Sequence, residues 1–271
     1  MQRCTIRLGT ALALLGASSA CTTLGPMPAT TAISAVAAER PDVELQVGAI
    51  PGYYLSSAVA KDPEGSSVLQ AMLLFEPDDL IDAPGLVGGG RVIGSEDSGT
   101  YAELLLGYRR ALDQIRRFSL GAFGYASRGS ASRDDASYEA TRAGAEGVFD
   151  IAVTPEEEPV SVHVFAGASL TGIWANGEYC MDAEGFGMDC GSSPPPRVKA
   201  EAVGFYPALS GGLALNLGRH AESVFHGLRL AIHGAGGTMP RVIGARQQNP
   251  ESFGAGGVSL TLGLGAATKD R

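Results

Sequence analysis

The chain has 271 residues, of which 45% are apolar and 18% are charged. This balance excludes an intrinsically disordered protein, because such chains combine low hydrophobicity with high charge. The formal net charge is −9 with three lysines, which excludes binding of DNA or RNA through a basic surface.

Residues 1–20 have the composition of an export signal. Arg3 and Arg7 supply positive charge ahead of the short apolar segment Leu8–Ala17. That segment is shorter than the ~20 residues that a membrane-spanning helix needs. It leads to Ser18-Ser19-Ala20, small residues of the kind that precede a leader-peptidase site. We therefore expect a secretory signal peptide over 1–20, with a buried N-terminal helix as the alternative.

Cys21 follows this leader directly, and the arrangement resembles the leader of bacterial lipoproteins, in which a signal peptidase cuts before an acylated cysteine. The resemblance covers roughly residues 1–25 and implies that Cys21 carries a lipid. Ser18 stands where that family usually has Leu, so ordinary cleavage by signal peptidase I at the same bond is the alternative. Residues 21–42 are rich in Ala, Thr and Pro and are expected to form a flexible tether.

The remaining cysteines suggest a disulfide. Cys4 lies inside the expected leader, which leaves Cys21, Cys180 and Cys190 in the mature chain. Cys180 and Cys190 bracket a short polar loop, and we expect them to pair in an oxidising compartment. A metal pair is the alternative, although two cysteines without further ligands nearby do not make a metal site. Acylation would explain why Cys21 is the odd cysteine.

From Val43 onward the dominant pattern is an alternation of apolar with polar or small residues, which indicates β-strands. In the last segment Val258, Leu260 and Leu262 fall on one face, and Ser259 and Thr261 fall on the other. The alternation is least clear between residues 43 and 99, so a count of eight strands is the alternative to ten. The ten predicted strands lie near 43–59, 66–77, 86–95, 99–111, 115–127, 137–153, 160–175, 201–217, 227–239 and 253–268.

The connections between these strands alternate in length. Short links lie near 112–114, 155–159 and 219–226, and longer polar ones near 127–137, 177–200 and 242–252. This pattern predicts an all-β fold, an antiparallel up-and-down transmembrane β-barrel, with residues 43–271 as the barrel domain.

The body from about 43 to 268 resembles outer-membrane β-barrel proteins in this pattern rather than in a motif. The resemblance implies a bacterial outer-membrane location and a periplasmic N-terminus. It also implies two partners, the outer-membrane lipids and the barrel-assembly machinery. That machinery commonly recognises a C-terminal aromatic residue, whereas this chain ends in Thr268-Lys269-Asp270-Arg271.

Alternation alone does not tell which face of a barrel points inward, but charges on the less apolar face do. We expect this face to line the lumen, because charges of balanced sign can pair there and neighbouring Ser119, Gly121 and Gly144 leave room. A solvated outer face is the alternative. Tyr108, Phe118, Phe225 and Trp174 lie near strand ends, as aromatic girdle residues do. The expected lumen charge cluster consists of Glu103, Arg109, Arg117, Arg142, Glu146 and Asp150.

The sequence contains no motif that points to catalysis, a cofactor or a metal. It has no HExxH, no GxSxG, and no Lys-Ser/Thr after the glycine run 88–90. The acidic segment Met181–Asp189 does not match a calcium-binding EF-hand loop. His163 with Ser161 and Ser169 is the nearest approach to a catalytic group. We therefore expect no cofactor, no metal and no enzymatic activity.

The leading functional hypothesis is a non-enzymatic outer-membrane barrel with a structural, surface-binding or narrow-pore role. A barrel of ten strands leaves little room for a wide channel. The first alternative is a soluble periplasmic lipoprotein, a β-sandwich or barrel that binds an apolar ligand or a protein partner. The second is an outer-membrane barrel enzyme that acts on lipid.

Overall fold

The computed structural model describes twelve β-strands, with gaps between them. The described residues are 43–55, 68–76, 83–95, 99–113, 117–132, 136–154, 160–180, 197–217, 225–240, 242–243, 246–247 and 249–264. The strands are β1 (Val43–Leu55), β2 (Val68–Phe75), β3 (Leu86–Ser95), β4 (Gly99–Ala111), β5 (Phe118–Ser132), β6 (Ala136–Ala152), β7 (Val160–Cys180), β8 (Arg197–Leu217), β9 (Phe225–Met239), β10 (Val242–Ile243), β11 (Arg246–Gln247) and β12 (Glu251–Leu264).

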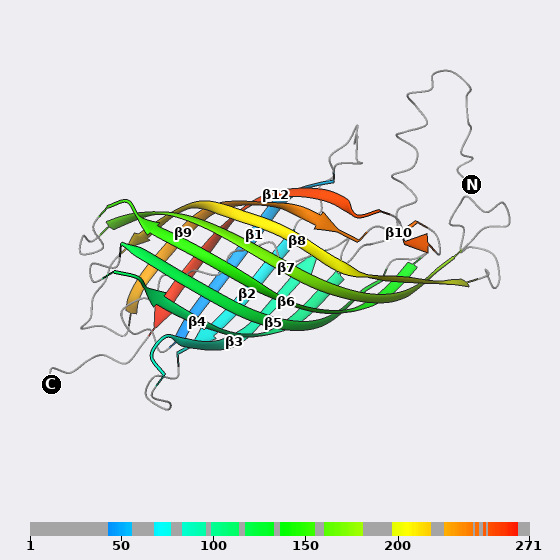
Figure 1. The fold of residues 1–271 in the computed structure, drawn as a ribbon, viewed down its shortest axis with the longest axis horizontal. Helices are drawn as coiled ribbons and strands as arrows, with labels where there is room; N and C mark the ends of the chain where they lie inside the picture. The colour runs from blue at the N-terminus through cyan, green and yellow to red at the C-terminus, as the bar shows by residue number, and fades with distance from the viewer. Residues whose placement is uncertain are drawn as a thin grey trace, which may run out of the picture.

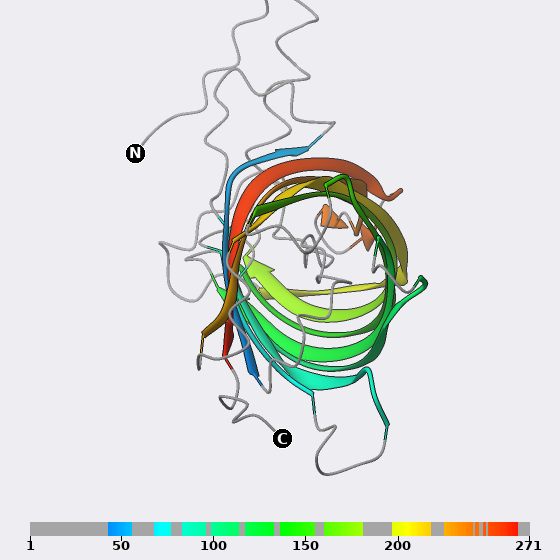
Figure 2. The same cartoon turned by 90° about the vertical axis from the view of Figure 1, so that its left-hand side faces the viewer.

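Ten of these strands form one closed antiparallel barrel. Each barrel strand pairs with the next one along the chain, and β1 pairs with β12 to close the ring. The end view in Figure 2 shows the ring. Closure gives the backbone groups of the outermost strands a partner, so this barrel has no sheet edge where β1 and β12 meet. The predicted ten-stranded up-and-down barrel is confirmed, and the alternative of eight strands is wrong.

Both ends of the described barrel lie at the same end of the ring, because Val43 in β1 pairs with Leu264 in β12. We call this the terminal end of the barrel. β2, β4, β6 and β8 run antiparallel to β1 and finish at this end. β1, β3, β5, β7 and β9 finish at the opposite end.

The strands differ greatly in length around the ring. β7 and β8 have 21 residues each and pair over their whole length, whereas β2 has eight residues. Figure 1 shows the resulting wall of long strands from β5 to β9 beside shorter strands from β1 to β4. At a rise of ~3.3 Å per residue, β7 and β8 are about twice as long as a strand needs to be to cross a bilayer.

Two of the predicted long loops are shorter than expected. The connection after β5 was expected over 127–137, but Ser132 pairs with Ser137 and the strands continue nearly to the turn. The connection after β7 was expected over 177–200, but Cys180 pairs with Arg197. Both stretches are rich in polar and small residues, which the prediction assigned to loops.

The first part of β8, residues 197–207, does not pair with β9. β8 pairs with β9 only from Ala208 onward, and the residue before it is Pro207, which has no backbone N–H to donate. The chain after β9 instead forms the small β10–β11 sheet, which lies beside β8. Residues 242–252 were predicted as a loop, and these two short strands were not.

The inner side of the wall is packed with apolar side chains as well as polar ones. One cluster joins β2 to β5, and a second joins β7, β8 and β9 through Phe165, Ala214 and Ala231. The first cluster consists of Met72, Leu74, Val87, Leu105, Phe123 and Tyr125. These residues alternate along their strands with exposed leucines, so β2 to β5 are apolar on both faces in several places.

No helix within the described ranges is long and apolar enough to span a membrane. Several expectations fall on residues outside these ranges: the signal peptide over 1–20, the tether over 21–42, the acylation of Cys21 and the chain end after 264. Cys180 ends β7, but Cys190 is not among the described residues, so their disulfide stays a prediction.

Glycine at position 107 is required by packing. A β-carbon there would overlap the ring of Phe123 and crowd the carbonyl oxygen of Ala122, both on the neighbouring strand. Gly107→Ala should therefore lower the free energy of unfolding by about 1–3 kcal/mol, the usual cost of overpacking. Gly147→Ala is the matched control, because a β-carbon at Gly147 meets no atom within 4 Å. Urea unfolding of both variants in the same lipid or detergent checks this, and equal midpoints would contradict it.

Candidate functional site

The inner face of the barrel carries acidic or arginine side chains on β1, β3, β4, β6 and β9. Glu103 and Arg109 on β4 and Arg142, Glu146 and Asp150 on β6 are all buried, with at most 5% of each residue exposed. Alternate residues on the same strands are open, since Leu104 is 75% exposed and Leu106 is 62% exposed. The charged stripe therefore faces the interior and the aliphatic stripe faces outward.

Arg117 does not belong to this set, and the prediction that it faces the lumen is wrong. It is exposed, immediately before the first residue of β5, and its guanidinium lies 5.8 Å from the centre of the Phe118 ring. Because Phe118 points outward, Arg117 lies on the outer surface at the terminal end. The prediction applied the alternation of β5 to Arg117, but β5 begins only at Phe118.

The first group of charges, the central cluster, contains Arg91, Glu103, Arg142 and Glu146. The Nε atom of Arg91 donates to the carboxylate of Glu103 at 2.7 Å, and Nη2 of Arg142 donates to the other oxygen of Glu103 at 3.2 Å. Glu146 adds a further electrostatic attraction to Arg91. Two guanidinium groups thus face two carboxylates, so the buried charges of this cluster balance.

Neutral groups complete the surroundings of Arg142. Its Nε atom donates to Oγ of Ser127 at 2.9 Å, and its guanidinium lies 4.1 Å from the centre of the Tyr101 ring. A cation over an aromatic face is attracted by the ring quadrupole, most strongly where water is excluded. Arg142 is fully buried, and these contacts replace its lost hydration.

The second group, the Arg109 cluster, lies at the terminal end. Arg109 on β4 donates to both carboxylate oxygens of Glu44 on β1, at 2.9 and 3.0 Å, and it also pairs with Glu76 just after β2. β1 and β4 are not neighbours in the ring. The contact between Arg109 and Glu44 therefore crosses the lumen and ties two separate walls together.

The third group, the Asp150 cluster, lies at the same end and joins β6, β7, β8 and β9. Asp150 accepts a hydrogen bond from Nδ1 of His163 at 2.7 Å and one from Nη2 of Arg229 at 2.6 Å. Nε2 of His163 lies 3.0 Å from Oγ of Ser161 and 3.0 Å from Nδ2 of Asn216. The Oδ1 atom of Asn216 accepts from Arg229 at 3.3 Å. The pair of Asp150 on β6 with Arg229 on β9 again crosses the lumen.

Sequence reasoning found the inward charges of β4 and β6 but missed their partners on other strands. Arg91, Glu44 and Glu76 come from the region between 43 and 99, where apolar residues occupy both faces. Arg229 lies on the inward face of β9, as the spacing from His233 would have indicated. Counting the positive and negative charges on the predicted inward faces would have indicated that such partners are needed.

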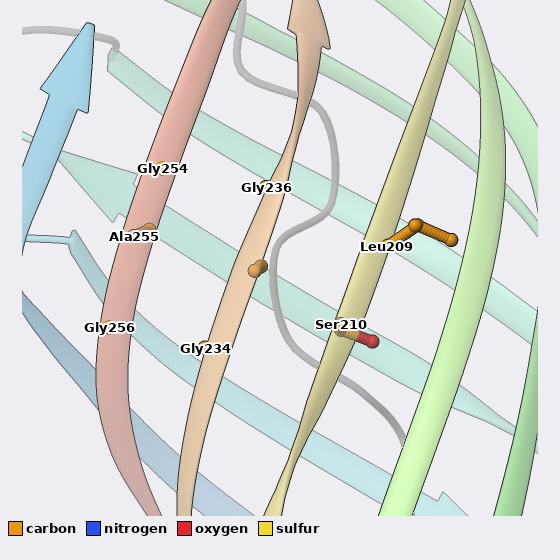
Figure 3. A pocket seen from close by; sticks show the side chains of 8 residues that line it. Leu209, Ser210, Gly234, Gly236, Gly254, Ala255 and Gly256 are labelled. Atoms are coloured by element: carbon orange, nitrogen blue, oxygen red, sulfur yellow. The ribbon is translucent and has the colours of Figure 1, made fainter.

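The outer wall offers shallow hollows rather than a pocket with converging polar groups. Figure 3 shows one of them on β8, β9 and β12, where Gly234, Gly236, Gly254 and Gly256 leave the backbone uncovered beside Leu209. Small residues of β5, β6 and β7 form another hollow. Within the described ranges, no group of three or more His, Cys, Asp and Glu residues is placed to hold a metal ion.

Comparisons with known proteins yield similarities of fold at low identity. No protein-family model matches the chain, and no curated protein matches it. Among solved structures, Neisserial surface protein A is similar at 10% identity with a TM-score of 0.32, covering 82% of this chain and 97% of that one. The CymD monoaromatic hydrocarbon channel is similar at 9% identity with a TM-score of 0.28, covering 91% and 99%. Similarity at these values says nothing about function.

Removal of a buried cation from the central cluster should destabilise the barrel strongly. Arg142→Ala leaves buried Glu103 without one of its two guanidinium partners, so we expect the free energy of unfolding to fall by about 3–5 kcal/mol. Arg128→Ala is the matched control, because Arg128 pairs with Glu139 on the outer surface, where both side chains are mostly exposed and such pairs contribute little. Similar losses in both variants, measured by urea unfolding in lipid, would contradict the account of the interior.

Proposed function

We propose that this chain is an integral outer-membrane barrel whose lumen is closed by side chains and whose role is structural or surface-binding. The observation that carries the proposal is the inverted polarity of the wall. Leu104, Phe205 and Leu209 are 68–75% exposed to their surroundings. Arg91, Arg109 and Arg142, by contrast, are at most 2% exposed. Water would not favour this arrangement, because it exposes the aliphatic groups and encloses the ionic ones.

The limits of the apolar outer face support a bilayer as its surroundings. At the terminal end Phe118 stacks on Phe149, with ring centres 6.2 Å apart, and Arg117, the residue before Phe118, is exposed. Toward the opposite end Trp174 packs edge-on against Phe205. Aromatic residues collect where a membrane meets water, so these two pairs fit the edges of a hydrocarbon layer.

Beyond Trp174 and Phe205 the outer surface becomes charged. Lys199 and Glu201 are exposed on β8, and the exposed pair of Arg128 with Glu139 joins β5 to β6, with 2.9 Å between nitrogen and oxygen. The ends of β7 and β8 thus project into water on the side away from the termini. With a periplasmic N-terminus, this projecting wall belongs to the cell surface, which favours a surface role.

A closed polypeptide ring satisfies its backbone hydrogen bonds without water, and this is why barrels rather than open sheets span membranes. An export signal, expected over residues 1–20, would deliver the chain to the cell envelope. Together these features favour the bacterial outer membrane. The soluble periplasmic alternative is disfavoured, because a soluble barrel would bury the leucines that this wall exposes.

The lumen favours a closed barrel over a pore. Among its lining side chains, Arg91, Arg109, Arg142, Tyr206 and Ile173 are fully buried, so they fill space that water would occupy in a channel. Interiors of small barrels are commonly filled by side chains in this way. Of the three roles in the hypothesis, the narrow pore is therefore less favoured than the structural and the surface-binding role.

Placing a charge on the outward stripe tests the membrane location. Leu104→Arg should lower the free energy of unfolding in lipid vesicles by about 2–4 kcal/mol, the cost of a cation near the centre of a bilayer. Glu201→Arg, on the projecting end of β8, is the matched control and should change the stability little. If Leu104→Arg is tolerated as well as Glu201→Arg in the same vesicles, the wall does not face lipid.

The closed lumen predicts an absence of steady ion flow. Barrels refolded into planar lipid bilayers should give no stepwise conductance above the background of protein-free membranes, because the three clusters and the apolar groups occupy the interior. A wide porin reconstituted in the same way is the positive control. Reproducible ohmic conductance steps from the pure barrel would show that the lumen is open and would favour a pore.

A further inference from the structure

The Asp150 cluster contains a serine, a histidine and an aspartate in the arrangement of a hydrolytic relay. Oγ of Ser161 lies 3.0 Å from Nε2 of His163, and Nδ1 of His163 lies 2.7 Å from Oδ1 of Asp150. Such a relay is recognised by distances and roles rather than by order in the sequence. Ser161 and His163 are two residues apart on the inner face of β7, and Asp150 reaches them from β6.

We propose that Ser161 is the nucleophile and His163 the general base of a site that hydrolyses carboxylic esters. Asp150 is a positioning residue: it accepts a hydrogen bond from Nδ1–H of His163, and the lone pair of Nε2 is then directed at Ser161. Arg229 donates to the second oxygen of Asp150 at 2.6 Å and helps to hold the carboxylate in place. This activity would be additional to the membrane role proposed above, and it runs against the expectation that the chain has no enzymatic activity.

Asn216 supplies the remaining element, a donor for the oxygen that becomes negative during acyl transfer. It lies opposite Ser161 on β8, and its Nδ2 atom is 3.0 Å from Nε2 of His163. Nε2 has one lone pair, so when Ser161 donates to it, an N–H of Asn216 is available to another acceptor beside Ser161. Side-chain amides of this kind stabilise oxyanions in acyl transfer.

The surroundings limit the substrate to small esters with an apolar acyl part. Ser161 is 4% exposed, whereas Asn216 and Arg229 are partly exposed, so the approach lies on their side, at the terminal end. The apolar group of Phe165, Ala214 and Ala231 adjoins the relay on the inner face, where Ala214 pairs with His163 and Ala231 pairs with Ala214. An acyl chain lying toward this group would leave the alcohol part facing the mouth of the barrel.

The reaction balances with water as the second reactant. Oγ of Ser161 bonds to the carbonyl carbon while its proton passes to Nε2 of His163. The bond from that carbon to the alkoxy oxygen then breaks, and the alcohol leaves with the proton from His163. Water attacks the acyl-serine in the same way, its proton passing through His163 back to Ser161, and the carboxylic acid is released.

Labelling with diisopropyl fluorophosphate, a small reagent that phosphorylates activated serines with loss of fluoride, tests the proposal. The full-length barrel, refolded in detergent, should be labelled at Ser161, as located by mass spectrometry of its peptides. Ser161→Ala should abolish the label, and His163→Ala should slow it by about 100-fold or more, since general-base catalysis contributes ~10²–10⁴. Ser169→Ala, an inward serine farther along the same strand, should label as the wild type does.

Each sample is first checked for heat-modifiable migration in detergent gels, so that failure of the barrel is distinguished from failure of the relay. Asp150→Asn should slow labelling and change its dependence on pH while the barrel still migrates as a folded species. A folded wild-type barrel that is not labelled, or that is labelled at a serine other than Ser161, overturns the proposal. Labelling of His163→Ala at the wild-type rate overturns it as well.

Discussion

A guanidinium group sealed inside a protein needs a carboxylate within hydrogen-bond reach, because an isolated buried charge is far more costly than a solvated one. Most of this barrel's interior follows from that constraint. Arg142 is matched by Glu103, Arg109 by Glu44, and Arg229 by Asp150. All three pairs join strands that are not neighbours in the ring. The pairs therefore tie together strands that are not joined by backbone hydrogen bonds.

The same constraint decides which side of the sheet faces out. Once the charged stripe is inside, the period of two along each strand places Leu104, Leu213 and Val258 on the outer surface. The exposed aliphatic stripe favours a non-aqueous surrounding, and an aromatic pair lies toward each end of it. The long strands β7 and β8 extend beyond this stripe, and their excess length carries the charged surface that begins beyond Phe205.

The sequence predicted the parts of the barrel in which one face is apolar and the other is not. It placed Arg142 and Asp150 together on β6 and indicated ten strands. It placed a strand near 66–77, where β2 lies, but inward Leu74 and outward Leu73 are both leucine, so the inward face was not recognisable there. The partners of Arg109, which lie on β1 and just after β2, were therefore missed. The sequence named Ser161 beside His163 but could not add Asp150, because that contact depends on the register of β6 against β7. Register is set by pairing between strands, which no single strand encodes.

The orientation of consecutive leucines on β4 tests the central claim most directly. In the isotopically labelled barrel in lipid nanodiscs, nuclear Overhauser contacts can be measured between lipid acyl-chain protons and the methyl groups of Leu104, Leu105 and Leu106. The inverted barrel predicts strong acyl contacts for Leu104 and Leu106 and none for Leu105, which is 5% exposed and packs inside. Acyl contacts at Leu105 without contacts at Leu104 and Leu106, or contacts at none of the three, would contradict it.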